Sequence, residues 1–253
     1  PGFELLDASG PATVFNGANR LLAGAGRDPA YRVGMVSSEG GRVASSSGIV
    51  VESRAIAALA RTRPGTMLVA GAEKAPLLRA MADARLVEAL PRLAARAERF
   101  GSVCTGAFVL GACGLLDGHR VATHWDACDE LARSWPAADV DPDSLYLTDG
   151  RLWTSAGVTA GIDMALAMVA ADLGAGVAGR VAKRLVLYAR RPGYQSQFSP
   201  LLQAQARADS PFAGLIEWIH ANLDATLDVP SLAERAGLSE RTFHRRFQAA
   251  TGQ

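Results

Sequence analysis

The sequence is poor in the features that mark several large protein classes. It has only 3 cysteines, at positions 104, 113 and 128, and their spacing forms neither a CxxC pair nor a set of metal ligands. No apolar run reaches transmembrane length, and no basic segment followed by an apolar one marks a secretion signal. We therefore expect a soluble, cytosolic protein with reduced thiols, without a metal or a cofactor.

The charge is nearly balanced overall but unevenly distributed. The formal net charge is +1, yet residues 1–175 contain 16 Lys and Arg against 19 Asp and Glu, while residues 176–253 contain 10 against 6. The first part thus has a net charge of −3 and the second of +4. A basic excess in a short segment is typical of a module that binds a polyanion.

Strand-like and helix-like patterns alternate through the first part of the chain. The expected strands are 31–36, 66–70, 145–148 and 151–154. Residues 76–98 have helical spacing, with a break expected near Pro91, and Asp149-Gly150 predicts a type I′ hairpin turn. The alternation predicts a mostly parallel sheet with helices on both faces, where ligands bind beyond the carboxyl ends of the strands.

Cys104 lies where a short apolar run ends and a helical pattern begins at once. Such a sharp turn lifts its central residue out of the layers and places a thiol near the first amides of a helix. Because unpaired N–H groups and the helix dipole favour a thiolate, we predict a lowered pKa and a role as nucleophile or oxidation sensor. The alternative is a small, buried, unreactive cysteine.

A second pattern, helix, glycine turn, helix, begins at Asp228. Asp228 is placed to cap the first helix, Gly237 ends it, and Ser239 is placed to cap the second. Phe243 and Phe247 stand one turn apart on the expected inner face. These features occur at the offsets of a helix-turn-helix motif.

The outer face of this last helix is basic. Arg241, His244 and Arg245 are three and four positions apart and share one face, with Arg246 beside them. Arginines on a second helix can contact guanine edges while neighbouring groups contact phosphate. The alternative is a solvated face of an ordinary helical hairpin.

These patterns predict a domain at 1–175, a basic helix and polar linker at 176–211, and a helix-turn-helix domain at 212–253. The linker is rich in glutamine, including Gln203 and Gln205. Because the chain lacks an initial Met and stops within a helical pattern, we expect a fragment at both ends.

Two resemblances cover nearly the whole chain. Ser239, Arg241, Arg245 and Phe247 match the first helix-turn-helix of AraC-type transcriptional regulators. Four other segments resemble the PfpI-like, glutamine-amidotransferase-like domain, namely residues 3–11, 103–107, 122–125 and 154–163. Regulators that join these two domains in this order form the GlxA-like group.

The resemblance implies a flavodoxin-like three-layer α/β/α sandwich with a pocket around Cys104, followed by a small all-α domain. It implies that Asp7, from the first loop, approaches the thiol, and that backbone at Gly71 and Ala72 helps Thr105 form an oxyanion site. It also implies double-stranded DNA as a partner, and a first domain that senses a small molecule or serves as a homodimerisation platform.

An enzyme is the competing interpretation. Asp7, Cys104 and Thr105 match the acid, nucleophile and neighbouring threonine of isonitrile hydratases in the same superfamily, and an amidase-like hydrolase would use the same pair. Thr105 replaces the histidine of peptidase-like members, which argues against peptidase chemistry. The hydratases lack the C-terminal module, so its presence favours sensing over turnover. We leave His124 outside the catalytic set, because a hydrogen-bonded structural role is an equal alternative for it. Asp163, near the start of a helix, has the alternative of a helix residue favoured by the dipole.

Overall fold

The computed structural model describes residues 1–197, 212, 214, 215, 218, 219, 222, 224 and 227–251. The chain divides into two units, 1–197 and 198–253. The linker segment expected at 198–211, with its glutamines, lies outside the described residues, and the short helix expected at 215–222 is described only in part.

The first unit alternates helices and strands. Its strands are β1 (Val36–Ser37), β2 (Gly41–Ala44), β3 (Val50–Ala55), β4 (Thr66–Val69), β5 (Arg99–Val103), β6 (Arg120–Val121), β7 (Asp139–Val140), β8 (Tyr146–Asp149) and β9 (Leu152–Ser155). Its helices are α1 (Leu5–Ala23), η1 (Ile56–Leu59), α2 (Lys74–Ala82), α3 (Ala84–Arg96), α4 (Gly106–Ala112), η2 (Trp125–Ala127), α5 (Cys128–Ser134), α6 (Thr159–Leu173) and α7 (Ala175–Arg184).

The central sheet has the strand order β4-β5-β9-β8. Strands β4, β5 and β9 are parallel, and β8 pairs antiparallel with β9. Val69 of β4 pairs with Ser102, and Val103 of β5 pairs with Ser155, so the three parallel strands end at one edge. The segments that follow these strands therefore meet there.

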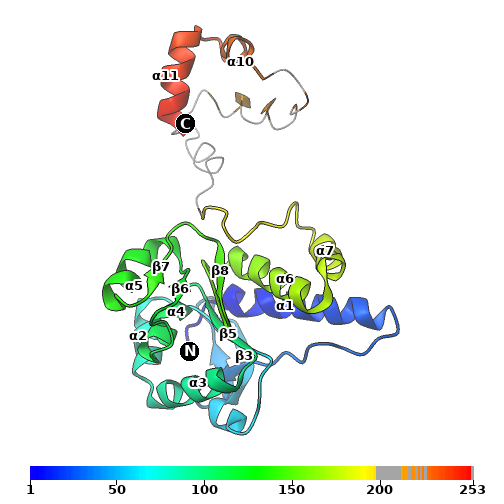
Figure 1. The fold of residues 1–253 in the computed structure, drawn as a ribbon, viewed down its shortest axis with the longest axis vertical. Helices are drawn as coiled ribbons and strands as arrows, with labels where there is room; N and C mark the ends of the chain where they lie inside the picture. The colour runs from blue at the N-terminus through cyan, green and yellow to red at the C-terminus, as the bar shows by residue number, and fades with distance from the viewer. Residues whose placement is uncertain are drawn as a thin grey trace. The chain divides into compact units, whose positions relative to one another are not determined.

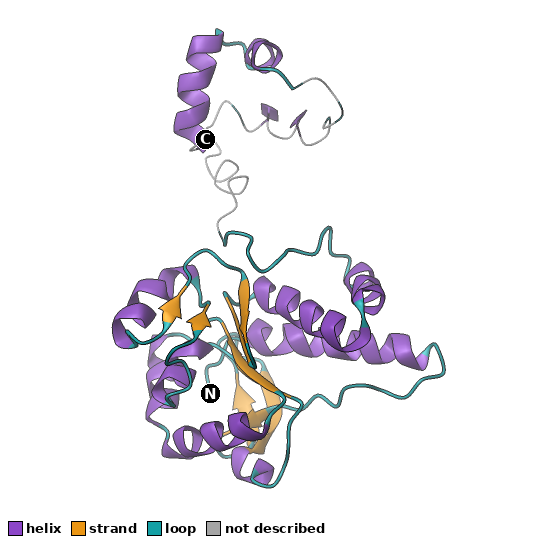
Figure 2. Cartoon of the chain, in the orientation of Figure 1, coloured by secondary structure: helices purple, strands orange, loops and turns teal. Residues whose placement is uncertain are grey.

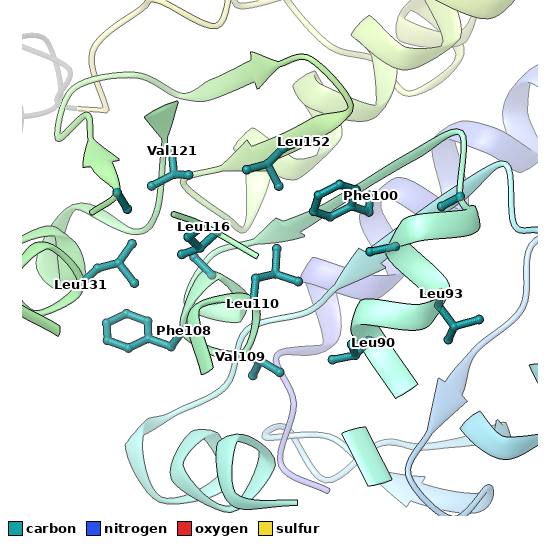
Figure 3. Close-up of a cluster of buried hydrophobic side chains, with 14 of the residues drawn as sticks. Leu90, Leu93, Phe100, Phe108, Val109, Leu110, Leu116, Val121, Leu131 and Leu152 are labelled. Atoms are coloured by element: carbon teal, nitrogen blue, oxygen red, sulfur yellow. The ribbon is translucent and has the colours of Figure 1, made fainter. Parts of the chain in front are cut away.

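Helices cover both faces of this sheet, as Figures 1 and 2 show. Helices α1, α6 and α7 lie on one face, and α2 to α5 lie on the other. Side chains alternate accordingly, because Val103 packs in the cluster of α1 and α6 while Phe100 packs with Leu110 and Leu152 in the other (Figure 3). The expected three-layer sandwich is confirmed. The sequence placed helix α7 with the linker, but α7 packs in the cluster of α1 and α6 through its buried Val181.

Two local expectations were wrong. In the segment 31–36 only Val36 is in a strand, since Tyr31 instead bonds to Asn19 through backbone and side-chain atoms. The helical region breaks at Asp83 rather than Pro91, because the Asp83 side chain accepts the Arg85 N–H and caps a new helix.

A hairpin joins β8 and β9 as predicted, but its loop lies one residue later than Asp149-Gly150 and its turn type differs. Asp149 pairs with Leu152, so Gly150 and Arg151 form the two-residue loop. Gly150 has φ 58°, whereas Arg151 does not have a positive φ. A type I′ turn needs a positive φ at both positions, so this loop has the glycine-first pattern of a type II′ turn.

In the second unit the structure describes two well-formed helices, α10 (Val229–Arg235) and α11 (Glu240–Thr251). The Asp228 side chain accepts the Ser231 N–H at 2.9 Å and caps α10. Gly237, with φ 65°, connects the two helices. Phe243 is buried against Phe212 and Phe247, with ring centroids 5.6 and 5.1 Å away. Both helices lie where the sequence placed them.

Candidate functional site

Cys104 occupies the turn between β5 and α4. Its φ is 57°, which is unusual for a residue other than glycine, and its N–H donates to Ser155 O at 2.9 Å. Thr105 follows at once as the N-terminal cap residue of α4. The sharp strand-to-helix turn is therefore present as predicted, with the thiol only partly exposed.

Asp7 lies in the first turn of α1, not in a loop as expected. Only 2% of its surface is exposed, and both carboxylate oxygens accept backbone N–H groups. Oδ1 accepts from Val158 at 2.8 Å and Oδ2 from Gly71 at 3.0 Å. Burial raises the pKa of Asp7 to about 6, against the lowering effect of these two hydrogen bonds.

Two glycines bring the site residues close together. A Cβ at Gly71 would lie 2.8 Å from Asp7 Oδ2, 2.8 Å from Thr105 Oγ1 and 2.9 Å from Cys104 Cβ. A Cβ at Gly157, whose φ is 98°, would lie 2.8 Å from Cys104 Sγ. The acid, the thiol and the threonine thus converge on a space that admits no further side chain at either glycine.

The backbone N–H groups of Gly71 and Ala72, which were expected to stabilise an oxyanion with Thr105, are occupied by other hydrogen bonds. The Thr105 hydroxyl donates to Ala72 O at 2.8 Å, and it accepts from Ala72 N at 3.0 Å. The Gly71 N–H is bonded to Asp7. Each backbone N–H is a single donor, so neither amide is available for a developing oxyanion in this arrangement. Gly71 lies beside Cys104, and Ala72 lies beside Thr105, but the amides of both are used in hydrogen bonds within the protein.

The prediction of a lowered thiol pKa is wrong. Burial and the negative charge of Asp7 raise the pKa of Cys104 to about 12, although the Thr105 backbone N–H and side chain act to lower it. The N-terminal end of α4 therefore does not outweigh the loss of hydration and the like charge. In this state Cys104 is a thiol at neutral pH, which does not favour nucleophilic attack.

Gly157 and Val158 were missed as site residues. They connect β9 to α6, and Val158 has φ 50°, a strained conformation for a β-branched residue. A signal was present, because a strand pattern again changes to a helical one within a few residues, as it does at Cys104. Two strained turns thus flank Asp7.

His124 and Asp163 do not join the pocket's hydrogen bonds described above. His124 Nδ1 accepts the Asp126 N–H at 3.4 Å and caps η2, which agrees with its structural interpretation. Asp163 lies near the start of α6, where it is buried and forms an ion pair with Arg191.

The candidate nucleic-acid surface lies on α11. All of the expected residues are exposed, namely Ser239, Arg241, His244, Arg245 and Arg246. The Ser239 hydroxyl is 2.9 Å from that of Thr242. Within the described part of the chain, the three arginines take part in no ion pair. Their guanidinium groups therefore retain donors for an external anion.

The described residues offer neither a membrane span nor a metal site. None of the described helices combines the length and apolar character that a membrane crossing requires. No cluster of three or more His, Cys, Asp or Glu side chains in the described residues could bind a metal ion.

The fold and the cysteine turn define a flavodoxin-like α/β domain, and comparison with known proteins identifies its family. The DJ-1/PfpI family pattern matches residues 1–171. The chain belongs to the DJ-1/PfpI family. Among solved structures, a ThiJ/PfpI family protein from Pseudomonas syringae has a TM-score of 0.65 at 25% identity, covering 87% of this chain and 83% of that one.

Some relatives match beyond this domain. The HTH-type transcriptional regulator CdhR of Pseudomonas aeruginosa is 32% identical over 98% of this chain and 71% of its own length. The HTH-type transcriptional regulator GlxA of Rhizobium meliloti is 28% identical over 99% of this chain and 75% of its own. An isonitrile hydratase of Pseudomonas putida is 40% identical, over 50% of this chain and 52% of its own. The alignment with regulators thus includes the helical second unit, and that with the hydratase covers half of the chain.

Proposed function

We propose that the chain is a transcriptional regulator of the AraC type that binds double-stranded DNA through α11. The observation that carries this proposal is the match to CdhR and GlxA over nearly the whole chain, including both C-terminal helices. The exposed arginines of α11 supply the chemistry that DNA binding needs. The whole-chain match favours regulation over isonitrile hydration.

In this proposal α11 enters the major groove as the second helix of the motif. Arg241 and Arg245 are one turn apart on its exposed face, so both can contact base edges or phosphates of one site. The aromatic contacts of Phe243 and Phe247 with Phe212 hold the opposite face of α11. A rigid helix loses less entropy on docking, which strengthens binding.

The first unit then senses a small molecule or serves as a homodimerisation platform. Its pocket is poorly arranged for turnover, since the thiol has a raised pKa and the neighbouring amides are already bonded. The match to the transcriptional regulators CdhR and GlxA over nearly the whole chain supports a sensing or assembly role for this unit.

The proposal is tested by binding of the full chain to fragments of its own upstream DNA, measured by fluorescence anisotropy over a salt series with nonspecific competitor. A specific regulator binds one fragment far more tightly than competitor at moderate salt. Equal binding to all fragments, lost at modest salt, would reduce the interaction to nonspecific electrostatic attraction and contradict the proposal.

A further inference from the structure

Residues 191–197, which we call the strap, are the last residues of the first unit. The next residue in sequence begins the second unit, so any force between the units along the chain passes through the strap. The strap is not part of a helix or strand, yet hydrogen bonds join its two ends and its middle to the rest of the first unit. These bonds lead back to the Cys104 pocket.

The first end of the strap is bonded to the start of α6. The Arg191 guanidinium donates to Asp163 Oδ2 from Nε at 2.8 Å, and its backbone N–H donates to Oδ1 at 3.2 Å. A third donor, an Nη of Arg191, bonds to Thr159 Oγ1 at 2.9 Å. Thr159 directly follows Val158, which donates to Asp7 Oδ1. Arg191 is therefore bonded to the helix turn that also contacts the pocket acid.

The other end of the strap, at Gln197, is hydrogen-bonded to residues on the other side of the pocket. The Gln197 Nε2 group lies 3.0 Å from Thr123 O, 3.1 Å from Ser144 O and 3.3 Å from Pro142 O. Three acceptors around one side-chain atom fix it as the amide nitrogen. The Thr123 hydroxyl in turn donates to Cys104 O at 3.0 Å. Gln197 is thus linked to the Cys104 carbonyl through one residue.

The middle of the strap lies directly on the edge strand. Leu145 N donates to Gly193 O at 2.8 Å, and a Cβ at Gly193 would lie only 2.4 Å from Tyr146 O. Only glycine lets the backbone approach so closely. Because Gln197 Oε1 is buried without a hydrogen-bond partner in the described residues, the final contact is incompletely satisfied and is easier to release.

We propose that the strap transmits the state of the Cys104 pocket to the DNA-binding unit. In the arrangement seen here, Val158 and Thr123 position the two anchors of the strap; a ligand that displaces either residue shifts the equilibrium towards a released strap and changes DNA affinity. This inference rests on the proposed function, because it takes the second unit as the output.

The first test perturbs the pocket and measures hydrogen–deuterium exchange in the strap of the full chain. Asp7→Asn replaces one carboxylate oxygen by a donor, so one of the two N–H bonds to residue 7 is lost. We expect the exchange of peptides covering 191–197 to accelerate by at least about fivefold. Thr123→Val, which removes only the hydroxyl bond to Cys104, serves as a second variant with the same expectation. Faster exchange near Val158 with an unchanged strap would overturn the proposal.

The second test measures operator affinity. Gln197→Met removes the amide contacts, and Gln195→Met is the matched control, because the Gln195 side chain is exposed. We expect Gln197→Met to change affinity by at least about fivefold, Gln195→Met to match wild type, and Asp7→Asn to add little to Gln197→Met. If the effects of Asp7→Asn and Gln197→Met on operator affinity were additive, the strap would not be the connection between the pocket and the DNA-binding unit. Strap exchange that responds to Asp7→Asn in a protein that binds no operator would instead contradict the proposed function.

Discussion

Val158 donates its backbone N–H to Asp7 Oδ1 at 2.8 Å, across 151 positions of sequence. The bond joins the first turn of α1 to the turn that precedes α6, and the second oxygen of Asp7 bonds Gly71 after β4. Asp7 therefore connects three segments at the carboxyl edge of the sheet. Its charge state affects the stability of the fold as well as the pocket.

The raised pKa of Asp7 predicts a dependence of stability on pH. Burial raises this pKa from its ordinary value of 3.8 to about 6 in the folded chain, so the folded state binds the proton more tightly. Protonated Asp7 therefore stabilises the folded state. This contribution is complete below pH 3.8 and is lost as the pH rises through about 6. The full difference corresponds to about 3 kcal/mol of unfolding free energy.

Asp7→Asn removes this titration. Between about pH 4 and about pH 8, the unfolding free energy of the variant relative to wild type should therefore rise by about 2.4 kcal/mol, most of the full difference. Urea unfolding followed by tryptophan fluorescence measures it. A difference between the two proteins that does not vary with pH would show that Asp7 titrates normally.

Cys104 should react slowly with alkylating reagents. With its pKa raised to about 12, the thiolate fraction at neutral pH is far below that of a free cysteine, and alkylation should be at least about a hundredfold slower. Peptide mapping after iodoacetamide treatment over a pH series gives the rate at this residue. Asp7→Asn removes a nearby negative charge and should lower the thiol pKa. Rapid alkylation with a pKa below the ordinary value would support the expectation from sequence instead.

Gly71→Ala should fill the space between Asp7, Thr105 and Cys104. Because its Cβ would lie 2.8 to 2.9 Å from atoms of all three residues, we expect a loss of about 1–3 kcal/mol in unfolding free energy. Gly176→Ala is the control, since a Cβ there meets no atom within 4 Å. Thermal unfolding compares the two variants. Equal stability would mean that the pocket is wider than described.

Much of the fold was predictable because local patterns and tertiary structure agree. The turn at Cys104 follows from an apolar run that ends where a helical pattern begins, and the caps at Asp228 and Gly237 mark α10 directly. Errors arose where a contact distant in sequence decided the outcome. Tyr31 contacts Asn19 instead of joining a strand.

The pocket residues were predictable in identity but not in chemistry. Asp7, Thr105 and Gly71 do meet at Cys104, yet the sequence carries no measure of burial, which is the main cause of the raised pKa of the thiol. The turn at Val158 left a signal in the sequence, but its bond to Asp7 did not, because only the folded sheet brings these two residues together. Hydrogen bonds that occupy backbone amides are likewise properties of the assembled structure.

The central claim, that α11 recognises DNA, is tested most directly by operator binding of Arg241→Ala and Arg245→Ala in the full chain. Each substitution should weaken specific binding by about 1–3 kcal/mol, because each removes a guanidinium that contacts a base or phosphate. Arg20→Ala, an exposed arginine of the first unit, controls for the loss of one positive charge and should bind as wild type does. If both α11 variants bind the operator as tightly as wild type, α11 is not the recognition helix.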